Sequence, residues 1–194
     1  MQGKIEIVTG PMFSGKSAEL LVASRNLANE NLRVGLYQSV QNTRDDGIKS
    51  RNGDCLPAVK IKSLREIASD EHDAIIIDEL HFFSDVASEV KWLQKTRQIG
   101  KVVVAGVLDY DFSGKEMPIY SAIRQIGPDT ERKLTARCDE IADCVMPAEY
   151  SARLLNGQQL LEGPRILVDG VKATYSPRCK DHYLPITQLI SEAV

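Results

Sequence analysis

Short apolar runs alternate with longer amphipathic segments along the first two-thirds of the chain. Short uninterrupted apolar runs are typical of strands that are buried on both faces, and apolar residues at helical spacing predict a helix with one buried face. These patterns predict strands at residues 4–8, 33–37, 58–61, 74–77 and 101–105, and helices at 17–29, 64–68 and 86–98. The polar stretch 38–54 is expected to be a mobile loop. Strands that alternate with helices predict a parallel sheet covered by helices on both faces, and hence an α/β fold.

The pattern changes near residue 135. Helical spacing is lost, turn-forming pairs appear at Asn156-Gly157 and Gly163-Pro164, and three of the four cysteines lie in this last third. A small segment rich in loops needs something besides a hydrophobic core to stabilise it. We therefore expect two domains, an α/β domain at residues 1–134 and a small domain at residues 135–194.

Composition narrows the class of protein. No run approaches the roughly 20 apolar residues of a membrane helix, and the first residues, MQGKIEIVTG, do not resemble a signal peptide. We therefore expect a cytoplasmic protein without a membrane partner. The net charge of −3 and the lack of a basic cluster argue against a protein that follows a nucleic-acid backbone.

The clearest chemical motif lies at residues 10–17, GPMFSGKS, which matches G-x-x-x-x-G-K-[ST] in full between a predicted strand and a predicted helix. In such a P-loop the backbone N–H groups surround phosphate oxygens, and the helix adds the positive end of its dipole. Lys16 is expected to reach the β- and γ-phosphates of ATP, and Ser17 to bind Mg²⁺. The alternative is a glycine-rich turn that binds nothing. The predicted phosphate-binding residues are Gly10, Pro11, Met12, Phe13, Ser14, Gly15, Lys16 and Ser17.

Two carboxylates follow the predicted strand at 74–77. An aspartate in the position of Asp78 is typical of the Walker-B acid, which helps to hold Mg²⁺ beside a P-loop. Strand alternation points Glu79 the other way, where it is expected to take the proton of a bound hydroxyl as general base. Two alternatives stay open. The carboxylates could be solvated groups that cap the helix at 86–98, or the D-E-x-H spelling of 78–81 could mark a nucleic-acid-dependent ATPase, for which the chain lacks a second ATPase domain and a basic groove.

Cysteines and a histidine suggest a metal site in the last third. Cys138 and Cys144 form C-x5-C, and Cys179 and His182 form C-x2-H. Two such pairs, separated by a loop-rich stretch, are typical of a tetrahedral zinc ribbon, although the first spacing is wider than usual. The alternative is that these cysteines are simply buried. Cys55 has no partner near it in the sequence.

Taken together, the motifs resemble the small, zinc-containing thymidine kinases of bacteria, animals and some viruses. The matching stretches are GPMFSGKS at 10–17, Thr43-Arg44, DELHFF at 78–83, LDYDF at 108–112 and YSPRCKDHY at 175–183, in the family's order and spacing. The resemblance implies a P-loop, RecA-like parallel sheet flanked by helices, with a small zinc-ribbon and lasso domain. It also implies Mg²⁺-ATP-dependent phosphorylation of the thymidine 5′-hydroxyl in nucleotide salvage, with deoxyuridine as a further substrate, thymidine triphosphate as a feedback inhibitor, a structural zinc and a homotetramer.

The resemblance also implies roles for individual residues. Lys16, Glu79 and Arg44 are the catalytic residues, and Ser17 and Asp78 hold magnesium. The zinc ligands are Cys138, Cys144, Cys179 and His182. Substrate-binding residues are Met12, Phe82, Leu108, Phe112 and Ser151, together with Val168, Asp169, Gly170, Val171 and Lys172 of the lasso loop and Tyr175 at its end. For Phe82 and Phe112 core packing is an alternative, and for Tyr175 a surface turn.

The chain departs from the family pattern at several positions. Asn42 stands where the family usually has Asp, His81 where it has Gln, and Arg51 where it has His. Ile141 stands where a C-x2-C knuckle would place its second cysteine, so we align Cys144 there by an insertion of three residues. These differences leave open a nucleotide-binding regulator of the same fold that has lost catalysis.

Overall fold

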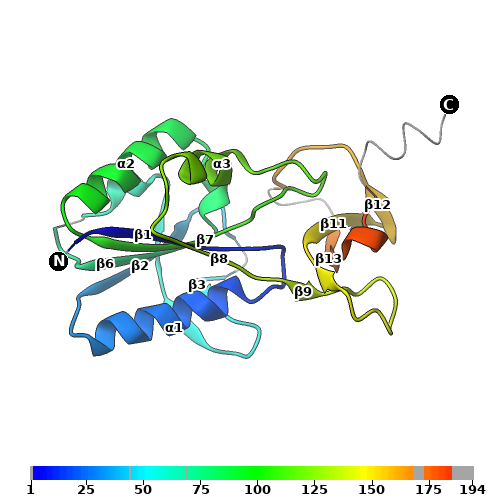
Figure 1. Cartoon of the computed structure of the whole chain (residues 1–194), viewed down its shortest axis with the longest axis horizontal. Helices are drawn as coiled ribbons and strands as arrows, with labels where there is room; N and C mark the ends of the chain where they lie inside the picture. The colour runs from blue at the N-terminus through cyan, green and yellow to red at the C-terminus, as the bar shows by residue number, and fades with distance from the viewer. Residues whose placement is uncertain (1, 44, 69, 168–172, 185–194) are drawn as a thin grey trace.

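The computed structural model describes residues 2–43, 45–68, 70–167 and 173–184, and all structural statements below refer to these residues. A six-stranded parallel sheet forms the larger part of the molecule, in the order β5-β2-β6-β7-β1-β8. Figure 1 shows α1 on one face of this sheet and α2 and α3 on the other. The strands are β1 (Lys4–Thr9), β2 (Val34–Ser39), β5 (Val59–Ile61), β6 (Ala74–Asp78), β7 (Val102–Val107) and β8 (Thr130–Lys133).

The helices cover the sheet because the central strands are apolar on both faces. Every residue of β6 and of β7 is buried. Alternate side chains enter two cores, one beneath α1 (Lys16–Asn29) and the other beneath α2 (Val86–Gln98) and α3 (Pro118–Gln125). The α/β fold that the sequence predicts is therefore confirmed.

Several local predictions need correction. Residues 38–54 were expected to be a loop, but this stretch contains β3 (Gly47–Lys49), which pairs with β4 (Cys55–Pro57) just beyond it. Ile48 of β3 is fully buried in the core beneath α1. The expected helix at 64–68 is a 3-10 turn, η1 (Leu64–Glu66). Helix α3 and the edge strand β8 were not predicted.

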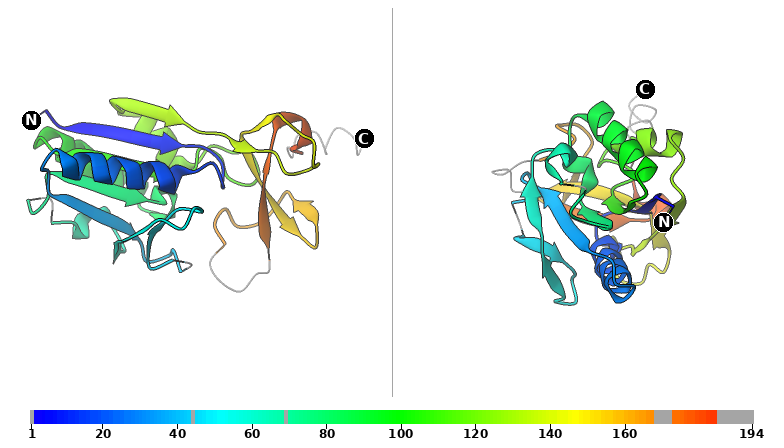
Figure 2. Two further views of the ribbon diagram at one scale, coloured as in Figure 1. Left: turned by 90° about the horizontal axis from the view of Figure 1, so that it is seen from below. Right: turned by 90° about the vertical axis from the view of Figure 1, so that its left-hand side faces the viewer.

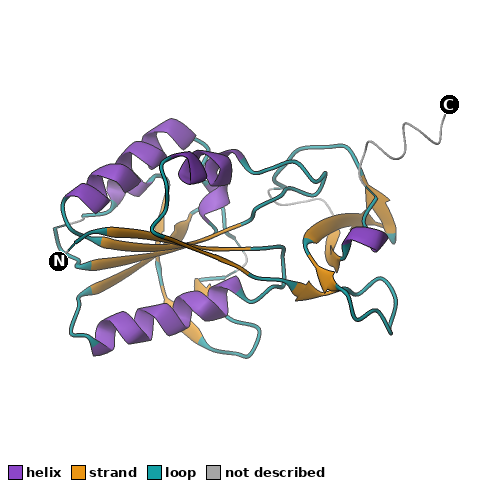
Figure 3. Cartoon of the chain, viewed as in Figure 1, coloured by secondary structure: helices purple, strands orange, loops and turns teal. Residues whose placement is uncertain are grey.

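The C-terminal part lies at one end of the main sheet and is built from short antiparallel strands (Figures 2 and 3). One small sheet pairs β9 (Ala136–Arg137) with β10 (Pro147–Ala148). The other has the order β12-β11-β13, with β11 (Tyr150–Leu155), β12 (Gln158–Leu160) and β13 (Thr174–Arg178), and a 3-10 turn, η3 (Lys180–His182), follows it. Among the helices described, none combines the length and the apolar character needed to cross a bilayer.

Candidate active site

The P-loop follows β1 and leads directly into α1. Backbone φ is positive at Gly10, Phe13 and Gly15, so the chain curls rather than continuing as a strand. Gly10 also has no room for a side chain, since a Cβ there would lie 2.3 Å from the carbonyl oxygen of Leu134. Because α1 begins at Lys16, the positive end of the helix dipole faces the loop. This geometry is that of an anion-binding loop.

Lys16 is held against its own loop. Its ammonium group is buried and donates hydrogen bonds to the carbonyl oxygens of Gly10 at 3.0 Å and Pro11 at 2.7 Å. Burial lowers the pKa of Lys16, and the nearby carboxylates of Glu79, Asp78 and Asp109 oppose that shift. The ammonium group therefore lies where phosphate oxygens would enter the loop.

Ser17 and Asp78 meet across the intervening strand β7. The Ser17 hydroxyl donates to Oδ2 of Asp78 at 2.9 Å, although Asp78 ends β6 and Ser17 lies in α1 after β1, and these two strands are not adjacent in the sheet. Between them lies Gly106, where a Cβ would stand 3.1 Å from Oδ1 of Asp78 and 3.0 Å from Cδ1 of Leu20. The absence of a side chain at Gly106 thus makes room for the Asp78 carboxylate.

Asp78 is almost completely buried, at 4% exposure. Loss of solvation raises its pKa to about 7, and the neighbouring Glu79 carboxylate adds to the shift. Hydrogen bonds from Ser17 and from the backbone N–H of Glu79, together with the charge of Lys16, oppose it. A buried carboxylate beside a hydroxyl oxygen offers the hard oxygen ligands that Mg²⁺ prefers.

Glu79 is placed by an unusual backbone conformation. It has φ 54° and ψ 45°, in the left-handed region, and stands between β6 and the 3-10 turn η2 (Leu80–Phe82). Strand alternation therefore does not govern its direction, as the sequence argument assumed, because the strand ends at Asp78. Left-handed residues other than glycine are uncommon, and they gather at functional sites. Glu79 lines both of the cavities described next.

Two cavities share Met12 and Glu79. One surrounds the P-loop and is also lined by Asn42, Ser50 and Arg51. The other lies between the main sheet and the C-terminal part, and it contains every described residue that was expected to bind the nucleoside. Those residues are Met12, Phe82, Leu108, Phe112, Ser151 and Tyr175.

Hydrogen bonds join the second cavity to the P-loop and to the C-terminal strands. The Ser151 hydroxyl accepts from the backbone N–H of Met12 at 2.8 Å. The Tyr183 hydroxyl donates to the carbonyl oxygen of Phe112 at 2.9 Å, and its ring stacks on Tyr150 at 4.4 Å. The cavity wall is therefore anchored from both sides.

Arg153 is a functional candidate that the sequence argument missed. It is only 1% exposed, and its guanidinium donates to the Tyr175 hydroxyl at 2.9 Å and to the carbonyl oxygens of Pro164 at 2.7 Å and Arg165 at 3.0 Å. The same guanidinium lies over the Phe112 ring, 3.6 Å from its centre. A single arginine in the apolar strand YSARLL is the only sequence signal, and it does not reveal these distant partners.

Some predicted site residues lie outside the described part of the chain. Arg44, which was expected to reach the phosphates, is one of them, and the lasso residues are the others: Val168, Asp169, Gly170, Val171 and Lys172. The stretches on either side of these lasso residues are described and line the second cavity through Leu167 and Ala173.

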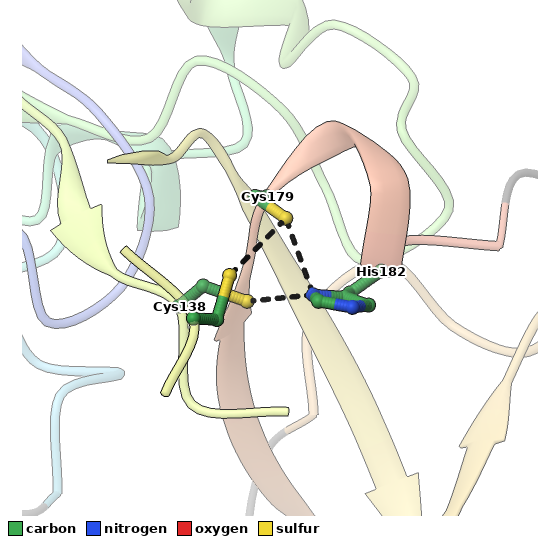
Figure 4. A group of neighbouring side chains, drawn as sticks. Cys138, Cys179 and His182 are labelled. Atoms are coloured by element: carbon green, nitrogen blue, oxygen red, sulfur yellow. Dashed lines mark hydrogen bonds between the residues drawn. The ribbon is translucent and has the colours of Figure 1, made fainter. Parts of the chain in front are cut away.

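The cysteine cluster lies at the far end of β13 from the cavity. Cys138, Cys144, Cys179 and His182 place their ligand atoms within 4.8 Å of one another. Figure 4 labels Cys138, Cys179 and His182 of this group. The Sγ atoms of Cys144 and Cys179 are 3.9 Å apart, and Nδ1 of His182 lies 3.5 Å from Sγ of Cys138. Tetrahedral zinc with bonds of about 2.3 Å to sulfur and about 2.0 Å to nitrogen needs edges of this size. The cluster is therefore consistent with a structural zinc, and the cysteine that joins it is Cys144, whereas Ile141 is 53% exposed.

Comparison with known proteins agrees with this geometry. A family model described as thymidine kinase matches residues 3–183. Thymidine kinases from two strains of Ureaplasma parvum serovar 3 are each 34% identical to the chain over 191 residues, which cover 93% of this chain and 82% of theirs. A thymidine kinase of Ureaplasma urealyticum serovar 10 is 33% identical over 191 residues, with the same coverage. The matched residues include the P-loop and all four members of the cysteine cluster, and the chain belongs to the thymidine kinase family.

Proposed function

We propose that the chain transfers the γ-phosphoryl group of ATP to the 5′-hydroxyl of thymidine, and also of deoxyuridine, with Glu79 as general base. The observation that carries the proposal is that Glu79 lines both the P-loop cavity and the cavity beside the C-terminal strands. A group in this position can face a nucleoside hydroxyl on one side and the phosphate donor on the other. Phosphoryl transfer depends chiefly on such positioning and on stabilisation of charge.

The P-loop side supplies the stabilisation of charge. The backbone N–H groups of the loop and the Lys16 ammonium are proposed to bind the β- and γ-phosphates, and the position of Lys16 beside the loop supports this. Ser17 and Asp78 would hold magnesium, which supplies positive charge to the phosphates when it is bound. Arg44 is proposed as a further phosphate ligand because of the family resemblance.

The nucleoside side supplies shape and orientation. Met12, Phe82, Leu108 and Phe112 offer apolar surface to a flat base, and Tyr175 lies where it can close over the nucleoside. Ser151 is proposed to lie near the 5-substituent of the base. Val168, Asp169, Gly170, Val171 and Lys172 are proposed to present backbone groups to the polar edge of the base, which needs partners once it is buried.

Glu79 is proposed to take the proton from the 5′-hydroxyl as the oxygen attacks the γ-phosphorus. The O–P bond to the nucleoside forms while the bond from phosphorus to the β–γ bridging oxygen breaks, and ADP leaves. The Glu79 side chain is 25% exposed, so it reaches the cavities while most of its surface is covered. A base held at hydrogen-bond distance from the hydroxyl contributes about 10²–10⁴-fold in rate.

Further proposals follow from the two connected cavities and from the family. Thymidine triphosphate would inhibit the enzyme by placing its base in one cavity and its phosphates in the other. A structural zinc would hold the cysteine cluster. The residues 1–134 and 135–194 are proposed as two domains. The homotetramer is proposed from the family resemblance alone, and the cytoplasmic location from the sequence composition.

The direct test is the release of ADP from Mg²⁺-ATP with thymidine, deoxyuridine, deoxycytidine or single-stranded DNA added separately. We expect thymidine and deoxyuridine to stimulate turnover, and deoxycytidine and DNA to leave it at the background rate. If ATP binds but no nucleoside stimulates turnover, the chain is a nucleotide-binding regulator. Stimulation by DNA alone would instead support the alternative of a nucleic-acid-dependent ATPase.

Glu79→Gln tests whether Glu79 is the general base. The amide keeps the size of the side chain but cannot accept the hydroxyl proton, so kcat should fall by about 10²–10⁴-fold while ATP binding stays nearly unchanged. The matched control is Glu162→Gln, because Glu162 is exposed and lines neither cavity. Steady-state kinetics checks both variants, and full activity of Glu79→Gln would reject Glu79 as the base.

Elemental analysis tests whether the cysteine cluster binds zinc. We expect about one zinc per chain in protein purified without chelator, and Cys144→Ser should lower both the zinc content and the unfolding temperature. Cys55→Ser is the matched control, because Cys55 is exposed and belongs to no described cluster of metal ligands. A Cys144→Ser protein with a full complement of zinc would exclude Cys144 as a ligand.

Arg153→Lys tests the anchoring of the nucleoside cavity. Lysine keeps the charge but cannot make all three hydrogen bonds or the flat contact with Phe112. We expect KM for thymidine to rise about tenfold or more, since each lost bond to a charged group is worth about 1.5–3 kcal/mol, while KM for ATP changes little. Arg25→Lys, an exposed arginine paired with Asp54, is the control. Equal rises in both KM values would contradict a role confined to the nucleoside side.

A further inference from the structure

His81 contacts Glu79, the proposed general base. It belongs to the 3-10 turn η2, two residues beyond Glu79, and its side chain is 5% exposed. Its Nε2 atom lies 3.3 Å from Oε2 of Glu79. The family resemblance leads one to expect Gln at this position, and His81 is one of the departures from it noted in the sequence.

The backbone of the neighbouring strand fixes which nitrogen carries the proton. The N–H of Leu108, just after β7, points at Nδ1 of His81 with a donor–acceptor distance of 3.5 Å. A backbone N–H can only donate, so Nδ1 must accept, and the proton of the neutral ring then lies on Nε2. An ionised carboxylate can only accept. In the neutral ring, the nitrogen that carries the proton is therefore the one that lies 3.3 Å from Oε2 of Glu79.

The ring is also held in its plane by packing. Its centre lies 4.7 Å from the centre of the Phe82 ring, with 31° between the two planes. Phe82 is 7% exposed and lines the nucleoside cavity, as does Leu108. The imidazole is thus fixed by contacts on the cavity wall, whereas Glu79 follows a strained backbone position and keeps a partly exposed side chain.

We propose that His81 is a positioning residue, which donates from Nε2 to one oxygen of the Glu79 carboxylate and turns the other oxygen toward the nucleoside hydroxyl. The proposal rests on the proposed role of Glu79 as base. In this arrangement the end of β7 sets the direction of the Glu79 carboxylate. The Leu108 N–H orients the His81 ring, and the ring in turn contacts the carboxylate. A glutamine side chain can reproduce this, since Oε1 can accept from the backbone and Nε2 can donate to Glu79.

The test compares His81→Leu with His81→Gln. Leucine fills the space but makes neither hydrogen bond, so kcat should fall about tenfold or more, while KM for ATP and for thymidine stays within about twofold. Glutamine should restore most of kcat. His72→Leu is the matched control, because His72 is also hydrogen-bonded, to the Tyr37 hydroxyl at 2.7 Å, but lines neither cavity, and it should leave kcat unchanged.

A double-mutant cycle separates positioning from packing. If His81 acts through Glu79, then Glu79→Gln with His81→Leu should turn over no more slowly than Glu79→Gln alone. The proposal would be overturned if His81→Leu lowered the kcat of Glu79→Gln by the same factor as it lowers the kcat of the unmodified protein. A His81→Gln enzyme as slow as His81→Leu would also overturn it. If His81→Leu fails to fold, judged by circular dichroism and zinc content, His81→Asn replaces it, because the shorter amide cannot span both partners. Full activity of Glu79→Gln would instead show that Glu79 is not the general base. Failure of the proposed function is therefore distinguishable from failure of the proposed role of His81.

Discussion

The parallel direction of all six strands is the constraint on which the site depends. In a parallel sheet every carboxyl end lies at the same edge, so loops that are far apart in the sequence meet there. The P-loop follows β1, Asp78 ends β6 with Glu79 just beyond it, and Leu108 follows β7. Because β7 separates β1 from β6, the contact between Ser17 and Asp78 passes over its backbone, and Gly106 leaves the space for it.

The C-terminal part completes the second cavity without a sizeable core of its own among its described residues. Its buried cluster consists of Cys138, Cys144, Cys179 and Ala148, with Ala136 packed against it. Apolar contacts on this scale stabilise little, and a metal bound at the cysteine cluster would compensate for that by coupling folding to ligation. Since β13 runs from Thr174 to Arg178 and Cys179 follows at once, the position of Tyr175 in the cavity is coupled to the order of the cluster.

The sequence predicts the main sheet and the P-loop well, because buried strands and amphipathic helices leave periodic signals and the loop has a spaced motif. It does not predict β8, whose four residues are all exposed and which joins the sheet through its backbone pairing with β1. It also misses Arg153, whose partners are 11 to 22 residues away along the chain and come together only in the fold. Strand alternation cannot be used to predict the direction of Glu79, because β6 ends at Asp78 and Glu79 has left-handed backbone angles.

The cysteine cluster illustrates how a resemblance and the structure complement each other. Spacing alone leaves the first pair irregular, and the alignment selects Cys144 by assuming a three-residue insertion. The fold places that insertion in an exposed turn, because residues 139–143 between Cys138 and Cys144 are all exposed, so the extra residues lengthen a surface loop without separating the ligands.

Electrostatics explains why binding and ionisation are linked at this site. Desolvation raises the pKa of Asp78 to about 7 and lowers that of Lys16, so burial alone favours the neutral form of each group. A carboxyl group whose pKa rises on folding contributes most to stability at low pH, and that contribution is lost as the pH rises toward the folded-state pKa. Above about pH 7 the charged Asp78 therefore opposes folding. A divalent cation favours the carboxylate and a triphosphate favours the ammonium group, so both ligands would stabilise the forms that burial disfavours. If Lys16 and Asp78 bind the phosphate donor and its metal as proposed, the groups that reduce the stability of the free protein would add to the affinity for these ligands.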